Sequence, residues 1–255
     1  MPEVMLNGFK HYYTDQGSGD VLIMLHGALG SAHNFEKHSD ILSDKFRVLA
    51  VDMRGMGRSE HVTEMVPSAW TDDLLALMDH LGIEKAHVFG TSLGSRICMR
   101  LGIFHSERVH SLVLNTPHIF LTPALDAVQN RAGGDGTTMP PPRQADLQNR
   151  HGEDWLGVVR NYFNIRNVKE LQEFYNFHEN LDQITCAVLT INTDNAGESF
   201  NDALEIKERI SGARLAIMPS FASDAASGYP QTSVHAVCNV VAEFIGSVAP
   251  VAVAS

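Results

Sequence analysis

The sequence contains little cysteine, few basic side chains and no long hydrophobic run. Its 255 residues include three cysteines, and none has the spacing to another cysteine or a histidine that a zinc or redox motif requires. Each lies among apolar residues, which predicts buried free thiols at Cys98, Cys186 and Cys238. We expect no metal ion and no other cofactor.

The charge balance argues against several kinds of partner. Lysine and arginine total 19 against 30 aspartates and glutamates, which gives a formal net charge of −11. Because basic side chains do not cluster, binding to nucleic acid or to anionic lipid is disfavoured. No apolar run approaches the roughly 18 residues that a membrane span needs. The first ten residues, MPEVMLNGFK, lack the pattern of a signal peptide, so we expect a cytoplasmic protein.

Short apolar runs alternate with amphipathic stretches along most of the chain. This alternation predicts an α/β fold with a mostly parallel sheet flanked by helices. The first 15 residues, which include MLNGFKHYYTD, predict an antiparallel hairpin at one edge. The predicted strands are 21–26, 46–52, 86–90, 109–115, 186–192 and 215–219, and the predicted helices between and after them are 69–81, 95–104 and 232–245.

One segment interrupts the alternation, because residues 118–180 contain no predicted core strand. It includes the Gly- and Pro-rich stretch RAGGDGTTMPPPR (131–143), which we expect to be flexible, and two helix-like pieces at 154–163 and 168–177. We therefore predict a helical cap at 118–180, inserted into a core formed by residues 1–117 and 181–255.

Residues 90–94, GTSLG, match the pattern G-x-S-x-G between a predicted strand and a predicted helix. In this context the pattern predicts a nucleophile elbow, a turn so tight that small residues are needed two positions either side of the serine. Gly90 and Gly94 meet that need. The turn would raise the Ser92 hydroxyl above the carboxyl end of the sheet, with the N-terminus of the next helix directed at developing negative charge.

Two further loops accompany the elbow, LHGALGS (25–31) and DMRGMGRSE (52–60). With these three motifs in this order, the chain resembles the α/β-hydrolase superfamily, and in particular small cofactor-free members such as 3-oxoadipate enol-lactonases and carbon–carbon bond hydrolases. The resemblance covers about 4–117 and resumes near 182. It implies an oxyanion hole made by the backbone N–H groups of Ala28 and Leu93, with Gly27 in the same loop and His26 in a structural role.

The acid of the family's catalytic triad is matched only loosely. The family carries an aspartate in the loop after the strand assigned to 186–192, commonly as G-x-x-D, whereas this chain has Asn192-Thr193-Asp194-Asn195. Strict spacing puts Asn195 in the acid's position, and Asp194 stands one residue early. Asp194 is the candidate acid if the loop is one residue shorter.

The histidine that serves as base in the family has no counterpart. The loop after the last predicted strand reads MPSFASDAASGYPQ (218–231), and the expected position falls on Ser223 or Asp224. No histidine occurs between His178 and His235. We expect Asp224 or Ser223 beside Ser92, and slow ester hydrolysis, because a carboxylate is a weak base near neutral pH. His118 is a further candidate, since it follows the strand ending at Asn115 and could lean over the same sheet edge.

Three functions remain compatible with this sequence. The first is hydrolysis of an ester, a lactone or a carbon–carbon bond in a small or medium organic molecule, with a base from an unexpected position or a replaced histidine. The second is a lyase, cyclisation or isomerisation step that uses the oxyanion hole and a carboxylate such as Asp224. The third is ligand binding without catalysis.

Overall fold

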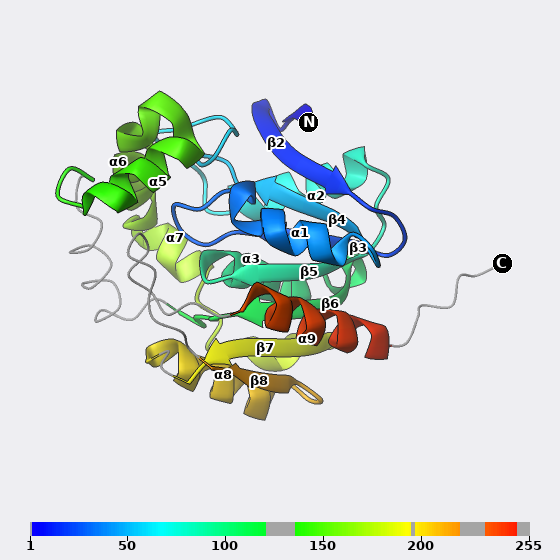
Figure 1. The fold of residues 1–255 in the computed structure, drawn as a ribbon. Coiled ribbons are helices and arrows are strands. Elements are labelled where there is room, and N and C mark those ends of the chain that lie inside the picture. The colour runs from blue at the N-terminus through cyan, green and yellow to red at the C-terminus, as the bar shows by residue number, and fades with distance from the viewer. Residues whose placement is uncertain (1, 121–135, 195–196, 220–232, 249–255) are drawn as a thin grey trace.

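The computed structural model describes residues 2–120, 136–194, 197–219 and 233–248 (Figure 1). In this part of the chain eight strands form one sheet in the order β1-β2-β4-β3-β5-β6-β7-β8. β2 pairs antiparallel with β1 and β4, and the other pairs are parallel, which confirms the mostly parallel sheet and the edge hairpin. The strands are β1 (Glu3–Leu6), β2 (Phe9–Gln16), β3 (Val21–Leu25), β4 (Arg47–Asp52), β5 (Ala86–Thr91), β6 (Val109–Asn115), β7 (Ala187–Thr193) and β8 (Arg214–Met218).

The central strands are buried on both faces, as their continuous apolar runs predict. In β3, Ile23 and Leu25 belong to one hydrophobic cluster, and Leu22 and Met24 belong to the cluster on the opposite face. Side chains alternate between the faces with a period of two, so a run without polar positions fills both clusters at once.

Helices cover both faces of the sheet. α1 (Glu36–Leu42) and α9 (Val234–Ser247) pack on one face, which is turned toward the viewer in Figure 1. α2 (Ala69–His80), α3 (Leu93–Phe104) and α8 (Glu198–Arg209) contribute to the cluster on the other face. The apolar pattern does not indicate α1 or α8. α3 begins at Leu93, two residues before the predicted start at Ser95, and Ser92 is its N-cap residue.

In the described part of the chain, three α-helices lie between β6 and β7 in the sequence and gather at one end of the sheet, at the left in Figure 1. They are α5 (Pro141–His151), α6 (Trp155–Arg166) and α7 (Lys169–Phe174), and we call them the inserted helices. Among the described residues of 118–180 no strand occurs, as predicted.

The start of α5 differs from the prediction of a flexible stretch at 131–143, of which residues 131–135 lie outside the described residues. Pro141 and Pro142 open this helix. Proline suits the first helical position because its missing N–H has no partner there and its φ is already helical. The described residues also contain four short 3₁₀ helices, at Ala32–Phe35, Ser106–Arg108, Gly152–Asp154 and Leu181–Gln183.

The three cysteines are free, as predicted. Cys98 and Cys238 are buried, whereas Cys186 is partly exposed. Burial raises the pKa of the Cys186 and Cys238 thiols to about 11 each, so they stay protonated and unreactive at neutral pH. No helix in the described part of the chain is both long and apolar enough to span a bilayer.

Candidate active site

The order of the strands creates a crevice at the carboxyl end of the sheet. β4, the next strand in the sequence, pairs with one side of β3, and β5 pairs with the other side. The order in which strands are added to the sheet therefore reverses at β3. Ligands of open α/β sheets bind outside the carboxyl ends of the strands at such a reversal. The loop after β3 and the turn after β5 meet here.

Ser92 occupies that turn in an unfavourable backbone conformation, with φ of 50° and ψ of −106°. L-residues rarely adopt such torsions, and holding them costs about 1–3 kcal/mol. The surroundings enforce the turn from both sides. The Ser92 N–H donates to the carbonyl of Asn115 on β6 over 2.9 Å, and the Ser95 N–H and hydroxyl donate to the Ser92 carbonyl over 3.0 and 2.6 Å.

The two glycines of the turn have no room for a side chain, as the G-x-S-x-G pattern predicts. A Cβ on Gly90 would lie 2.3 Å from the carbonyl carbon and oxygen of Gly94. A Cβ on Gly94 would lie 2.3 Å from the carbonyl oxygen of Leu25 at the end of β3. The ends of β3 and β5 and the start of α3 therefore pack backbone against backbone.

The 26–31 loop runs directly beside the serine. A Cβ on Gly27 would lie 3.5 Å from the Cβ of Ser92. His26 is fully buried and holds the loop, with Nδ1 2.8 Å from the Gly27 carbonyl and Nε2 accepting the Met53 N–H over 3.1 Å. Burial lowers the pKa of His26 to about 4, so the imidazole is neutral. These contacts agree with a structural role for His26.

The 52–60 loop is joined to the 26–31 loop through one carboxylate. Asp52 accepts the backbone N–H groups of Ala32 and Arg58. It is 1% exposed, and burial raises its pKa to about 6. A Cβ on Gly57 would lie 2.2 Å from an oxygen of this carboxylate, which explains a glycine at that position of the motif.

His151 of α5 connects the inserted helices to both loops. It is 4% exposed. Its Nδ1 accepts the Gly57 N–H over 2.9 Å, and its Nε2 lies 3.2 Å from the carbonyl oxygen of Leu29. Burial lowers the pKa of His151 to about 3, so the ring is neutral and donates from Nε2. Neither contact is visible in the sequence pattern.

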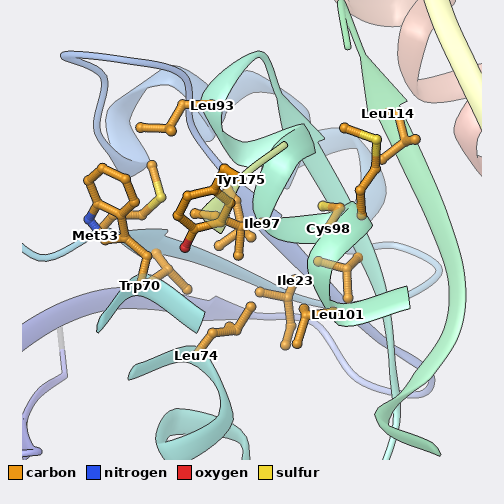
Figure 2. Close-up of a cluster of buried hydrophobic side chains, with 14 of the residues drawn as sticks. Ile23, Met53, Trp70, Leu74, Leu93, Ile97, Cys98, Leu101, Leu114 and Tyr175 are labelled. Carbon is orange, nitrogen blue, oxygen red and sulfur yellow. The ribbon is translucent and has the colours of Figure 1, made fainter. Parts of the chain in front are cut away.

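A cavity of about 500 Å³, its open mouth included, lies between the turn and the inserted helices. Trp70, Leu93 and Tyr175 belong both to its wall and to the main hydrophobic cluster, where they lie near one another in Figure 2. The core side contributes Ala28, Trp70, Ser92, Leu93, Arg96 and His118, and the inserted segment contributes Tyr162, Arg166, Leu171, Gln172 and Tyr175.

The cavity lining is positively charged, although the chain as a whole is acidic. Arg96 and Arg166 line it, and no aspartate or glutamate is among its described lining residues. The Arg96 Nε and Nη2 donate to the Tyr175 carbonyl over 3.2 and 2.7 Å. Burial lowers the pKa of Arg96 to about 10, which leaves the guanidinium charged at neutral pH. The described lining thus brings two guanidinium groups to the cavity that also contains Ser92.

His118 lies on the loop after β6 and lines the same cavity as Ser92. Its Nδ1 is 3.5 Å from Oδ2 of Asp202 on α8. The same carboxylate oxygen accepts the Ile119 N–H over 3.3 Å. Asp202 is thus paired with the only imidazole of the described lining, and sequence reasoning missed it, because nothing local distinguishes it from other carboxylates.

Comparison with known proteins bears on this arrangement. The family model described as alpha/beta hydrolase fold matches residues 20–165, more than half of the chain. The chain belongs to the alpha/beta hydrolase fold family. It is 36% identical over 115 residues to a 2-hydroxy-6-oxononadienedioate/2-hydroxy-6-oxononatrienedioate hydrolase from a Pseudomonas species, a match that covers 43% of this chain and 40% of that protein.

Solved structures of this family share the fold over nearly the full chain. The enol-lactonase from Burkholderia xenovorans LB400 has a TM-score of 0.71 at 22% identity, with 96% of this chain and 100% of that chain covered. A thermophilic esterase from Thermogutta terrifontis has a TM-score of 0.77 at 18% identity, with 97% and 98% covered. The curated relative above is matched over less than half its length.

The structure gathers some of the candidate residues of this alpha/beta hydrolase and not others. Ala28, Leu93 and His118 line the cavity with Ser92, and a Cβ on Gly27 would lie 3.5 Å from the Cβ of Ser92. Asp194 follows β7, is exposed, and is not among the described lining residues. The remaining candidates, Asn195, Ser223 and Asp224, lie outside the described residues. Among the described residues no group of three potential metal ligands occurs.

Proposed function

We propose that this chain is a serine hydrolase that cleaves an ester, a lactone or a carbon–carbon bond in a small organic molecule. The observation that carries the proposal is the strained Ser92 turn, which lies in the wall of a cavity shared with Ala28 and Leu93. A strained residue persists only where its surroundings enforce it, and such positions cluster at active sites.

The proposed reaction uses groups that line the cavity. The Ser92 Oγ attacks the carbonyl carbon of the substrate, and negative charge develops on the carbonyl oxygen. The backbone N–H groups of Ala28 and Leu93 stabilise that charge, with help from the N-terminus of α3. One such donor is worth roughly 10²–10³-fold in rate. The inserted helices act as a cap that limits water in the cavity.

The charge of the cavity supports an anionic substrate. Arg96 and Arg166 both line it. The Pseudomonas relative is named for a dioate, a molecule with two carboxylates. We propose that the substrate of this chain carries a carboxylate near the bond that breaks, held by one or both guanidinium groups.

Labelling with a fluorophosphonate tests the role of Ser92. We expect one covalent adduct, located by peptide mass spectrometry on the segment that contains Ser92, and no adduct in Ser92→Ala. Ser106→Ala is the matched control, because this serine is exposed and lies just beyond the other end of α3. An unlabelled wild type that still binds carboxylic acids would favour ligand binding without catalysis.

Paired esters test the proposed substrate charge. We expect kcat/KM for the 4-nitrophenyl monoester of adipate to exceed that for 4-nitrophenyl hexanoate by about tenfold, which corresponds to ~1.4 kcal/mol. The two esters have acyl chains of equal length. Arg166→Gln should lower this ratio. A wild-type ratio at or below one would reject the anionic substrate and leave the serine mechanism standing.

A further inference from the structure

Ser92 requires a group that takes its proton, because a serine hydroxyl is a poor nucleophile without an adjacent base. The described cavity lining offers few such groups. Burial raises the pKa of Tyr175 to about 12 and lowers that of Arg96 to about 10, so both side chains stay protonated at neutral pH. His118 is the one histidine among the described lining residues, and histidine is the side chain that most often serves as a general base.

The backbone holds the His118 loop next to the Ser92 turn. Thr91 of β5 is the register partner of Asn115 of β6, and the Ser92 N–H donates to the Asn115 carbonyl over 2.9 Å. Thr116, with φ of 46°, turns the chain and donates its N–H to the Ile191 carbonyl over 2.8 Å. His118 follows Asn115 by three residues, so its backbone stays within about 11 Å of that anchor.

The two ring nitrogens of His118 have different surroundings. Nδ1 is closed off from solvent, 3.5 Å from the Asp202 carboxylate, and makes no hydrogen bond to a described group. The side chains of His118 and Asp202 are each 15% exposed. Within the described part of the chain, Nε2 makes no hydrogen bond. Nδ1 thus faces a carboxylate, and the residue that carries it lines the same cavity as Ser92.

We propose that His118 is the general base for Ser92 and that Asp202 is a positioning residue that orients its imidazole. This proposal rests on the proposed function. It assigns the base to the loop after β6 instead of the loop after β8, where Asp224 and Ser223 are the sequence-based candidates. A carboxylate behind the imidazole fixes its tautomer and stabilises the imidazolium that forms.

The proton balance closes with water as the second reactant. As the bond from Ser92 Oγ to the carbonyl carbon forms, His118 takes the hydroxyl proton and the carbonyl electron pair moves to oxygen. The intermediate collapses, the bond to the leaving alkoxide breaks, and His118 returns the proton to that oxygen. Water then attacks the acyl carbon as His118 takes its proton, and this proton finally restores the Ser92 hydroxyl.

His118→Ala and His118→Gln test the base on the ester that the wild type hydrolyses best. We expect kcat to fall by roughly 10²–10⁴-fold, the usual contribution of general-base catalysis, with little change in KM. Imidazole added to the buffer should restore part of the rate of His118→Ala, which a merely structural role would not produce. His118→Gln keeps a polar side chain beside Asp202, so this variant is expected to fold even if His118→Ala does not. His80→Gln, an exposed residue in the last turn of α2, is the control.

Asp202→Asn tests the positioning role. We expect a lower kcat with little change in KM, and no further loss when Asp202→Asn is added to His118→Ala, because residues that act as a unit are strongly non-additive. Both His118 variants keeping a wild-type rate, with the rate lost in Asp224→Asn, would overturn the proposal. A wild type that is neither labelled nor active would instead reject the proposed function, and this assignment with it.

Discussion

Replacing Ser92 with glycine is expected to give a protein that is more stable than the wild type and has lost its hydrolytic activity. The cause is the backbone at this position, with φ of 50° and ψ of −106°. Glycine adopts positive φ without a steric cost, so the substitution releases strain of about 1–3 kcal/mol. The greater freedom of glycine in the unfolded chain offsets roughly 0.4–1 kcal/mol of that gain.

Urea unfolding measures this effect directly. We expect a higher midpoint at an unchanged m-value, and a net gain of about 1–2 kcal/mol in the free energy of unfolding. Ser92→Ala is the matched control, because it removes the hydroxyl but keeps the Cβ and therefore the strain. Both variants should lose hydrolysis by on the order of 10⁴-fold or more. A glycine variant less stable than the alanine variant would mean that the turn stores no strain.

Acidification from pH 6.5 to pH 4 is expected to destabilise the protein strongly. Burial lowers the pKa of His26, His38 and His87 to about 4 and that of His151 to about 3. The unfolded chain has histidine pKa values near 6.5, so between these values it binds protons that the folded protein does not. The free energy of unfolding therefore falls as the pH falls, by on the order of 5 kcal/mol or more for the four groups together.

One buried carboxyl acts in the opposite direction. The pKa of Asp52 is raised to about 6, so the stability that it contributes is present below the unfolded value and is lost as the pH rises through 6. A single group of this kind does not balance four imidazoles. The histidines therefore determine the net effect, and the free energy of unfolding falls as the pH falls.

Urea titrations between pH 7.5 and pH 4.5 check the prediction, and the slope of stability against pH counts the protons taken up on unfolding. His38→Phe is the informative variant. The His38 ring packs near Phe35 and Phe89, with centroids 5.7 and 6.4 Å away, so a phenyl ring keeps these ring contacts without titrating, although it loses the hydrogen bond to the Asn34 backbone. We expect its slope to be smaller by about one proton. Stability that stays level on acidification would show that these rings protonate inside the folded protein.

The sheet was predictable from the sequence because its cause is local. Strands such as β3 and β5 are buried on both faces and appear as continuous apolar runs, so the predicted bounds agree with the structure to within one residue at each end. The Ser92 turn was predictable for a similar reason. The turn leaves no room for a side chain at Gly90 and Gly94, and both positions are within two residues of Ser92 in the chain.

The walls of the cavity could not be predicted in the same way. Arg96 looks like an ordinary helical arginine until Tyr175, far along the chain, supplies the carbonyl that it binds. His118 and Asp202 come from a loop and a helix that meet only in the folded sheet. The prolines at the start of α5 resemble those of a flexible loop, since the same residues favour loops and first helical turns.

The contacts of His151 to the 26–31 and 52–60 loops set an order in which these loops can form during synthesis. The ribosome produces residues 26–60 well before it reaches this histidine, and at ~5–20 residues per second the interval is about 5–20 s. During that time the Leu29 carbonyl and the Gly57 N–H have no imidazole to bind. A growing chain is therefore expected to lack the final arrangement of these two loops until residue 151 has been made. Ribosome-bound fragments that end before residue 151 should for this reason be inert toward the metabolites around them.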